Sequence, residues 1–353
     1  MTDRPPTLGI LGAGQLAAMM TDAANRIGID VHVLRPTESD DRAPGNQLTT
    51  ASFDDSAAVL AFAETVDAVT VETENVPTET LRMLEPIVAV HPSADVIEIV
   101  QDRLLEKQFL TANDIPTAFY VAVGSAEELA TASESLGGPG IIKTRRFGYD
   151  GKGQARVNTP ADAAGAWDSH GAGPSILEAL VPFDCEISVV AGRSAAGDIA
   201  MFDPGRNEHR GGILHQTQVP AAVDRAVEEE AKQITRTILE AFNYVGVMGV
   251  EFFLTGSDLV VNEIAPRVHN SGHWTQQGCV VDQFEQHVRA VMGLALGSPE
   301  RHCDVVTTNI MGDDVSGLTT LLDATDTRVH LYGKREARPG RKMGHTNTVY
   351  ARS

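Results

Sequence analysis

A pair of glutamates in the second half of the chain has the residue type and spacing to bind a divalent cation. Glu251 and Glu263 belong to two apolar runs, 247–254 and 259–264, which a Gly-Ser-Asp loop at 256–258 joins. Two such runs around a short glycine-containing loop predict a β-hairpin. The two acids would then lie on paired strands, and the alignment of those strands decides whether they meet.

A three-residue loop would pair Thr255 with Leu259, and the same register sets Glu251 opposite Glu263, with Cβ atoms ~5 Å apart. Two carboxylates so placed repel each other unless a cation lies between them, and oxygen ligands favour magnesium over zinc. Asn262 offers a further oxygen. A register slip is the alternative, because it would put the two acids on different faces of the sheet.

A glycine-rich loop behind a lysine is the second chemical signal. The apolar run Ile141-Ile142 ends at Lys143, and the loop 144–154 contains three glycines within six residues. Glycines let a backbone fold closely over phosphates, and the lysine supplies positive charge. The spacing differs from that of a P-loop, and a plain hairpin turn is the alternative.

Two further segments carry groups suited to substrates. The stretch 178–181 can present backbone groups to an adenine edge, and Glu186 can hold ribose hydroxyls, although a single glutamate is commonly a solvated surface charge. The loop 264–275 follows the glutamate hairpin and crowds Arg267 together with two histidines, an asparagine and a serine. Such a concentration of polar and basic groups in a loop favours substrate contact.

The glycine motif near the N-terminus admits three interpretations. Residues 12–17, Gly-Ala-Gly-Gln-Leu-Ala, follow an apolar run and open a helical pattern, which resembles the dinucleotide fingerprint. A nicotinamide site is expected to have an acidic residue after the second strand, but Arg35 stands there and would suit only the 2′-phosphate of NADP. The alternatives are a phosphate or sugar contact at the helix N-terminus and a tight strand-to-helix turn.

The elements that would position these groups alternate between strands and helices at first. Strands are expected at 7–11, 31–34 and 68–71, and helices at 16–26 and 57–64, which predicts a parallel sheet covered by helices.

A second unit begins near Asp102, which can cap a helix over 103–112. An amphipathic helix at 225–242 precedes the glutamate hairpin, and a helix at 283–292 leads from it to a last unit of short strands.

The charge of the chain limits its partners. Of 353 residues, 28 are Lys or Arg and 48 are Asp or Glu, so the net charge is −20. Such a surface disfavours nucleic acid and membranes as partners, and an anionic substrate would need local positive charge, which 143–146 and 334–342 offer. Abundant acid with few lysines indicates a halophilic source, because salt screens self-repulsion.

Other features of the sequence favour a cytoplasmic protein. No apolar run approaches the ~18 residues of a membrane span, and no signal-peptide pattern is evident. Cys185, Cys279 and Cys303 have neither zinc nor disulfide spacing and are expected to be small core residues.

Taken in order, these motifs resemble the ATP-grasp superfamily and, within it, the N5-carboxyaminoimidazole ribonucleotide synthetase family. The resemblance spans nearly the whole chain. The glycine loop and paired glutamates are shared by ATP-grasp enzymes widely, whereas 262–275 and 330–345 are specific to this family. The stretches that carry the resemblance are 12–16, 72–77, 102–107, 143–154, 262–274, 330–334 and 338–345.

The resemblance implies an α/β fold that is α+β in its nucleotide-binding part. It implies a Rossmann-like parallel-sheet domain at 1–101, an ATP-grasp domain at 102–293 and a small C-terminal domain at 294–353. The implied activity is the ATP- and bicarbonate-dependent carboxylation of 5-aminoimidazole ribonucleotide in purine biosynthesis, through carboxyphosphate, with Mg²⁺ as cofactor. Enzymes of this kind are commonly homodimers.

The resemblance also implies roles for individual residues. The expected catalytic residues are Lys143, Tyr149 and Asp150, and the expected metal ligands are Glu251 and Glu263. The expected ATP contacts are Arg103, Lys143, Gly148, Tyr149, Asp150, Gly151, Lys152, Gly153, Gln154, Glu178, Ala179, Leu180, Val181, Glu186, His209, Asn262 and Glu263. The expected ribonucleotide contacts are Gln15, Glu72, Arg267, His269, Ser271, His273, Lys334 and Arg341, besides Tyr149 and Asp150.

The chain departs from the family pattern at two places. Ala17-Ala18 stands where Gly-Arg is usual, which removes one positive charge, and Val268 stands where proline is usual. Three other functions remain open at this point. They are another ATP-grasp ligase, such as a formate-dependent glycinamide ribonucleotide transformylase, an NADP-dependent oxidoreductase, and a non-catalytic nucleotide-binding regulator.

Overall fold

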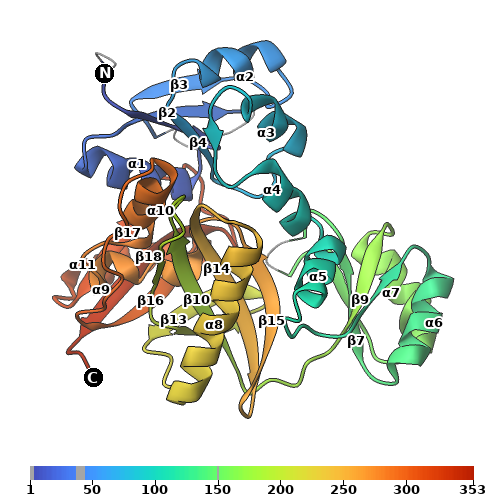
Figure 1. The fold of residues 1–353 in the computed structure, drawn as a ribbon. Coiled ribbons are helices and arrows are strands. Elements are labelled where there is room, and N and C mark those ends of the chain that lie inside the picture. Colours follow the sequence, from blue (N-terminus) through green and yellow to red (C-terminus); the bar gives the residue numbers. More distant parts are fainter. Residues whose placement is uncertain (1–3, 37–43, 149–150) are drawn as a thin grey trace.

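In the computed structural model, which describes residues 4–36, 44–148 and 151–353, the chain folds around three β-sheets (Figure 1). The first sheet is parallel, with the order β3-β2-β1-β4-β5. Its strands are β1 (Thr7–Leu11), β2 (Asp30–Arg35), β3 (Gln47–Thr50), β4 (Ala68–Val71) and β5 (Ala89–Val90). The helices along this part are α1 (Gln15–Arg26), α2 (Ser56–Ala63), α3 (Thr78–Leu84) and α4 (Ala94–Val100). The predicted alternation is confirmed, and β1 is buried throughout, as in a central parallel strand covered on both faces.

The second sheet is small and antiparallel, with the order β6-β9-β7-β8. Its elements are β6 (Tyr120–Val123), α6 (Ala126–Leu136), β7 (Gly140–Thr144), β8 (Gln154–Val157), a 3-10 turn (Pro160–Asp162), α7 (Ala163–His170) and β9 (Ser175–Ala179). It encloses an apolar cluster of its own around Leu129 and Ile142. Helix α5 (Arg103–Ala112) lies between this sheet and β15 (Figure 1). Asp102 caps α5 as predicted, since its side chain accepts from the N–H of Leu104 at 3.0 Å.

The third sheet is large, with the order β15-β14-β10-β12-β13-β16-β18-β17 and β11 paired to β10. Its strands are β10 (Cys185–Arg193), β11 (Ile199–Met201), β12 (Gly205–Arg210), β13 (Ile213–Val219), β14 (Gly246–Thr255), β15 (Asp258–Ala265), β16 (Asp304–Met311), β17 (Thr327–Leu331) and β18 (Lys342–Tyr350). The strands of the expected C-terminal unit, β16 to β18, therefore continue the same sheet as the glutamate hairpin.

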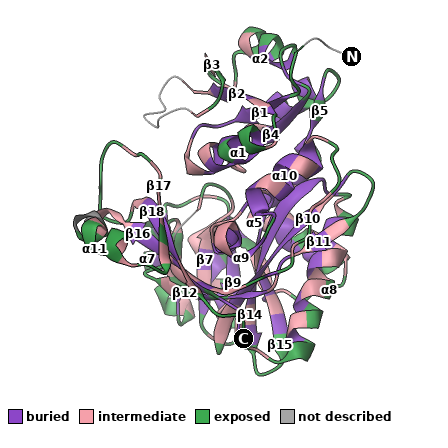
Figure 2. Ribbon diagram, turned by 90° about the vertical axis from the view of Figure 1, so that its left-hand side faces the viewer, coloured by how far each residue is buried: buried purple, intermediate pink, exposed green. Residues whose placement is uncertain are grey.

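Helices pack on the large sheet and join it to the first one. α8 (Arg225–Ala241) turns Val227, Ala231, Thr235 and Ile238 inward, at the three- and four-residue steps of a helix with one buried face, while its outer side is exposed (Figure 2). α10 (Gln283–Val291) lies between the large sheet and α1 (Figure 1). Shorter helices are α9 (Thr275–Gly278), α11 (Leu318–Asp323) and 3-10 turns at Asn270–Gly272 and Gly312–Gly317.

Two expectations from composition can be compared with this fold. Cys279 is buried, whereas Cys185 and Cys303 are partly buried against apolar clusters, and all three are free thiols. Among the described residues, no helix is both long and apolar enough to cross a membrane.

Candidate active site

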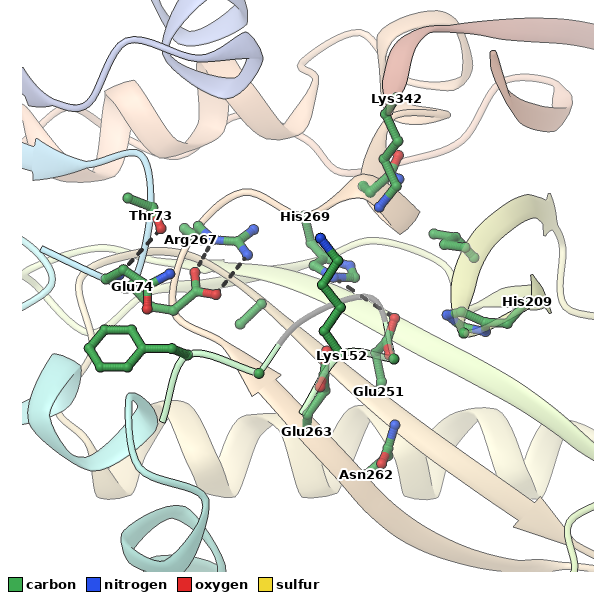
Figure 3. Close-up of a pocket in the computed structure, with 18 of the residues that line it drawn as sticks. Thr73, Glu74, Lys152, His209, Glu251, Asn262, Glu263, Arg267, His269 and Lys342 are labelled. Carbon is green, nitrogen blue, oxygen red and sulfur yellow. Dashed lines mark hydrogen bonds and ion pairs between the residues drawn. The ribbon is translucent and has the colours of Figure 1, made fainter. Parts of the chain in front are cut away.

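One cavity of about 920 Å³ brings together segments from all parts of the described chain (Figure 3). Its walls come from the turn before α1, the segment after β4, the glycine-rich loop, the glutamate hairpin and the segment before β18. Most predicted site residues line it: Gln15, Glu72, Arg103, Lys143, Gly148, Gly151, Lys152, Gln154, Glu186, His209, Glu251, Asn262, Glu263, Arg267, His269, His273, Lys334 and Arg341.

The other predicted site residues fall into two groups. Gly153, Glu178, Ala179, Leu180, Val181 and Ser271 are described by the structure but are not among the residues that line the cavity. Tyr149 and Asp150, to which catalytic roles were assigned, lie outside the described residues.

The predicted hairpin is present, but its loop is one residue shorter than predicted. Thr255 pairs with Asp258 and not with Leu259, so two residues and not three separate the strands. If that register continued, Glu251 would face Asn262. A shift by one residue moves a side chain to the other face of a sheet, so the predicted acid pair would be lost.

A β-bulge restores the pair. Phe252 is paired with Val261, yet Glu251 is paired with Glu263, so Asn262 is an extra residue in β15. The predicted arrangement of Glu251 opposite Glu263 is therefore confirmed. It arises from two departures that cancel, a shorter loop and a bulge, neither of which the sequence pattern indicated.

Helix α5 holds both sides of this bulge. Lys107 Nζ donates to the backbone oxygens of Asn262 (2.8 Å) and Val261 (3.2 Å). Glu106 Oε2 accepts from the N–H of Ile264 at 3.3 Å. Both side chains are almost fully buried. Because a bulge interrupts the hydrogen-bond ladder, α5 supplies the partners that its buried backbone groups require. Sequence reasoning missed this role, since adjacent charged residues on a helix usually indicate a solvated face.

The acid pair has the electrostatic character of a cation site. Burial, and next the charge of Glu263, raise the pKa of Glu251 to about 8. A cation between the two carboxylates would remove the repulsion that causes part of this shift. The available donors are carboxylate oxygens and the amide oxygen of Asn262, hard ligands of the kind that Mg²⁺ prefers, so the residues fit that ion. The two acids lie side by side in the cavity (Figure 3).

Glu251 also belongs to a second group of possible ligands. Its carboxylate, that of Glu186 and the imidazole of His209 place donor atoms within 4.8 Å of one another. His209 Nδ1 lies 2.8 Å from Glu186 Oε2. Burial alone would lower the pKa of His209, but the adjacent Glu186 carboxylate and the other nearby acids raise it. Sequence reasoning assigned Glu186 to ribose and His209 to the nucleotide, and did not anticipate that both meet Glu251.

Lys143 is held by an ion pair within the small sheet. Its Nζ lies 2.8 Å from Glu178 Oε2, and the Glu178 side chain is almost fully buried. Burial would raise the pKa of Glu178, but Lys143 and Lys107 together lower it. Glu178 therefore presents a charged carboxylate to the lysine, which orients Lys143 at the cavity wall.

The described residues of the glycine-rich loop line the cavity close to Arg103. Arg103 Nη2 donates to the carbonyl of Gly148 at 3.3 Å, and Thr144 N–H donates to the carbonyl of Gly153 at 2.8 Å. Gly153 has a φ of 70°, and a Cβ there would lie 2.6 Å from Thr144 Oγ1, so this position requires glycine. This close contact is made with Thr144 of the same loop, so the predicted approach of the loop backbone to phosphates stays a prediction.

The N-terminal glycine motif binds the chain's own carboxylate. Glu72 Oε2 accepts from the N–H of Gly14, and Glu72 Oε1 accepts from those of Leu16 (3.1 Å) and Ala17 (3.3 Å). These donors form the anion-binding end of α1. Because these N–H groups already have an acceptor in Glu72, the contact argues against a dinucleotide pyrophosphate there, while the expected phosphate or sugar contact at this helix terminus stays a prediction. Glu72 and Gln15 still line the cavity.

The loop after β15 is braced by two side chains that were not among the predicted site residues, the first being the partly buried Glu74. Arg267 forms a two-pronged ion pair with Glu74, including Nη2 to Oε1 at 3.2 Å (Figure 3). His269 Nε2 lies 3.9 Å from Glu251 Oε1, and Ser271 Oγ lies 2.8 Å from His269 Nδ1. Ser271 thus contacts the histidine and not the cavity. The second brace is Gln283, which is described below.

The basic segment before β18 supplies positive charge opposite the acids. Lys334, Arg338, Arg341 and Lys342 all line the cavity, and Lys342 points into it in Figure 3. Arg341 Nη1 donates to the carbonyl of Glu336 at 3.0 Å. Lys342 was not among the predicted site residues, although it stood in the basic run that the sequence showed.

The chain matches three family models. A ribonucleotide synthetase preATP-grasp domain matches residues 6–101, an ATP-grasp domain matches 108–284, and a phosphoribosylaminoimidazole carboxylase C-terminal domain matches 306–352.

Named relatives cover nearly the whole chain. The N5-carboxyaminoimidazole ribonucleotide synthase of Brucella melitensis is 44% identical over 98% of this chain and 97% of its own length. A crystal structure of the ADP complex of an N5-carboxyaminoimidazole ribonucleotide synthetase has a TM-score of 0.93 at 36% identity, covering 98% of this chain and 92% of that one. The Aspergillus clavatus enzyme in complex with ADP and 5-aminoimidazole ribonucleotide has a TM-score of 0.91 at 31% identity, covering 98% and 94%.

Proposed function

We infer the function of this chain from one premise: it belongs to the N5-carboxyaminoimidazole ribonucleotide synthase family of ATP-grasp enzymes. It is an ATP-dependent carbon–nitrogen ligase of purine biosynthesis. It uses ATP and bicarbonate to carboxylate 5-aminoimidazole ribonucleotide, with release of ADP and phosphate. The fold and activity implied by the sequence motifs are confirmed at this level.

The single observation that carries this function is the composition of one cavity. The glycine-rich loop, the paired acids and the basic C-terminal segment all line it, although they lie far apart in the sequence. A triphosphate needs cations and backbone donors, whereas an anionic ribonucleotide needs positive charge close to where the phosphoryl group is transferred. The cavity offers both within about 920 Å³.

We propose the following division of the chain. The Rossmann-like domain spans 1–101, the ATP-grasp domain 102–293 and the C-terminal domain 294–353. ATP contacts Arg103, Lys143, the loop 148–154, the stretch 178–181, Glu186, His209, Asn262 and Glu263. The ribonucleotide contacts Gln15, Glu72, Tyr149, Asp150, Arg267, His269, Ser271, His273, Lys334 and Arg341. The enzyme acts in the cytoplasm as a homodimer.

In the proposed mechanism, Glu251 and Glu263 would hold Mg²⁺, with Asn262 beside them. Such an ion would offset the charge that gathers on phosphate oxygens. Lys143, oriented by Glu178, supplies a second positive charge at the cavity wall. Phosphoryl transfer to bicarbonate gives carboxyphosphate, and the glycine-rich loop excludes water from it.

The carboxyl group then passes to the exocyclic amine of the ribonucleotide. We propose that Asp150 accepts or orients the amine proton. Positioning of the two substrates contributes more than any single proton transfer, because it replaces an encounter of separate molecules.

The decisive experiment measures ADP release with aminoimidazole ribonucleotide, with and without bicarbonate, in magnesium and high salt. We expect ADP release to require ATP, bicarbonate and aminoimidazole ribonucleotide together. Formate with glycinamide ribonucleotide serves as the control for the other ligase reaction. Stimulation by that pair, and not by bicarbonate with aminoimidazole ribonucleotide, would reassign the substrates.

A further inference from the structure

A buried glutamine behind the substrate loop has a fixed orientation. Gln283, the first residue of α10, is fully buried. Its Oε1 accepts from the N–H of His269 at 2.9 Å, and its Nε2 donates to the carbonyl of His269 at 2.7 Å. Since a backbone N–H only donates and a carbonyl only accepts, these two bonds determine which end of the amide is which.

The same amide determines the tautomer of His273. Gln283 Nε2 lies 3.0 Å from His273 Nδ1, and an amide nitrogen can only donate there. Nδ1 of His273 is therefore an acceptor, so the neutral ring carries its proton on Nε2. Within the described residues, no hydrogen bond engages that Nε2, and His273 lines the cavity.

His269 is held in the same tautomer by its own loop. The N–H of Ser271 lies 3.3 Å from His269 Nδ1 and can only donate, and Ser271 Oγ lies 2.8 Å from the same nitrogen. The proton of the neutral ring is therefore on Nε2, which lies 3.9 Å from Glu251 Oε1 in the cavity. Because each Nδ1 accepts a hydrogen bond, neither ring carries a second proton, and burial also lowers the pKa of His273 well below the ordinary value.

We propose that Gln283 is a positioning residue that orders the 269–273 loop, so that His269 and His273 both present Nε2–H donors to the cavity. Two neutral donors recognise an oxygen acceptor that has no proton to give, such as an anionic oxygen of bicarbonate or of the ribonucleotide. Neither ring can take up the amine proton at Nε2, because that nitrogen is already protonated. The identity of the acceptor rests on the proposed function, whereas the tautomers do not.

Nitrogen-15 NMR of the imidazole rings tests the tautomers without any substrate. His273 and His269, assigned by the loss of signals in His273→Gln and His269→Gln, should both show a protonated Nε2 and an unprotonated Nδ1 at neutral pH. In Gln283→Glu the carboxylate can accept from His269 N–H but cannot donate, so His273 should shift its proton to Nδ1. Gln283→Met, which lacks both amide groups, tests the same loss without adding a charge.

The kinetic arms separate the two possible acceptors. In Gln283→Glu, the histidine no longer donates from Nε2 to the anionic oxygen of the substrate. We expect the KM for that substrate, either bicarbonate or the ribonucleotide, to rise by roughly tenfold to a hundredfold. Gln286→Glu is the matched control. Gln286 lies in the same helix, is fully buried and forms two hydrogen bonds to Gly297, but contacts neither histidine.

The proposal fails if wild-type His273 carries its proton on Nδ1 or is charged. It also fails if Gln283→Glu changes both KM values no more than Gln286→Glu does. If the NMR result holds but no ribonucleotide stimulates ADP release, the proposed function fails and the tautomer assignment stands.

Discussion

Lys107 Nζ lies 2.8 Å from the backbone oxygen of Asn262, the extra residue that brings Glu263 opposite Glu251. The lysine is 1% exposed and does not line the cavity. Its contact with the bulge links helix α5 to the geometry of the acid pair, across 155 residues of sequence.

Lys107→Met should therefore weaken cation binding as well as stability. The two carbonyls that lose their donor cost about 1–3 kcal/mol of unfolding free energy. A misaligned acid pair should weaken Mn²⁺ binding roughly tenfold, because one carboxylate turns away from the ion. Denaturant unfolding and Mn²⁺ titration followed by electron paramagnetic resonance measure the two effects.

Leu129→Ala, in the separate core of the small sheet, is the control for lost stability. Equal Mn²⁺ affinities in Leu129→Ala and Lys107→Met would refute the role of Lys107.

Glu263→Ala should abolish ATP turnover. It leaves Glu251 without its partner, and a hard cation held by one buried carboxylate binds weakly. The measurement is ADP release at increasing magnesium concentration, with Asp258→Ala at the exposed end of the same strand as control. Full activity at ordinary magnesium would refute the role of Glu263 as a metal ligand.

Arg341→Ala should raise the apparent KM for the ribonucleotide and leave ATP binding unchanged. Arg341 lies in the basic segment before β18, and a phosphate contact made by arginine contributes about 1.5–3 kcal/mol, or roughly tenfold or more in KM. Steady-state kinetics with each substrate varied in turn measures this. A collapse of ATP affinity would mean that the two binding regions have been exchanged.

The stability of the metal-free protein should fall as the pH rises from about 5 to 8. The pKa of Glu251 is raised to about 8 and that of Glu106 to about 7, chiefly by burial. A carboxyl with a raised pKa keeps its proton in the folded state after the unfolded chain has lost it, so its contribution is complete below the unfolded value of 4.5 and is lost as the pH passes the folded value.

Glu251→Gln isolates the part that belongs to the acid pair. Urea unfolding with a chelator at pH 5.5, 7 and 8.5 should show a shallower decline in the variant than in the wild type. Added Mg²⁺ should flatten the wild-type curve, because it favours the charged carboxylates. Identical slopes in the two proteins would mean that Glu251 does not have the raised pKa.

Salt should stabilise the protein. A net charge of −20 repels itself, and the screening length falls from about 10 Å at 0.1 M salt to about 3 Å at 1 M. The melting temperature in potassium chloride should therefore rise across this range, which is the behaviour expected of a halophilic source. A melting temperature that stays constant or falls would count against that origin.

The sequence by itself determined the order of elements and the kinds of groups at the site. Apolar periodicity predicted the βαβαβ start and helices α8 and α10, because burial of one face leaves a repeat in the local sequence, and the residue type of Asp102 predicted the cap of α5. Residue types predicted the glutamate pair, the glycine-rich loop and the basic C-terminal segment, because metal binding, phosphate binding and anion binding each require particular side chains.

Only the tertiary structure decided how those groups are held. Lys107 contacts the bulge at Asn262, Glu178 pairs with Lys143, and Glu72 accepts from the N-terminus of α1. All three are contacts between segments that lie far apart in the sequence. A charged residue that is buried in the folded protein has the same neighbours in the sequence as one that faces water. Its partner is determined only when the sheets and helices pack, so the periodicity of the sequence cannot predict it.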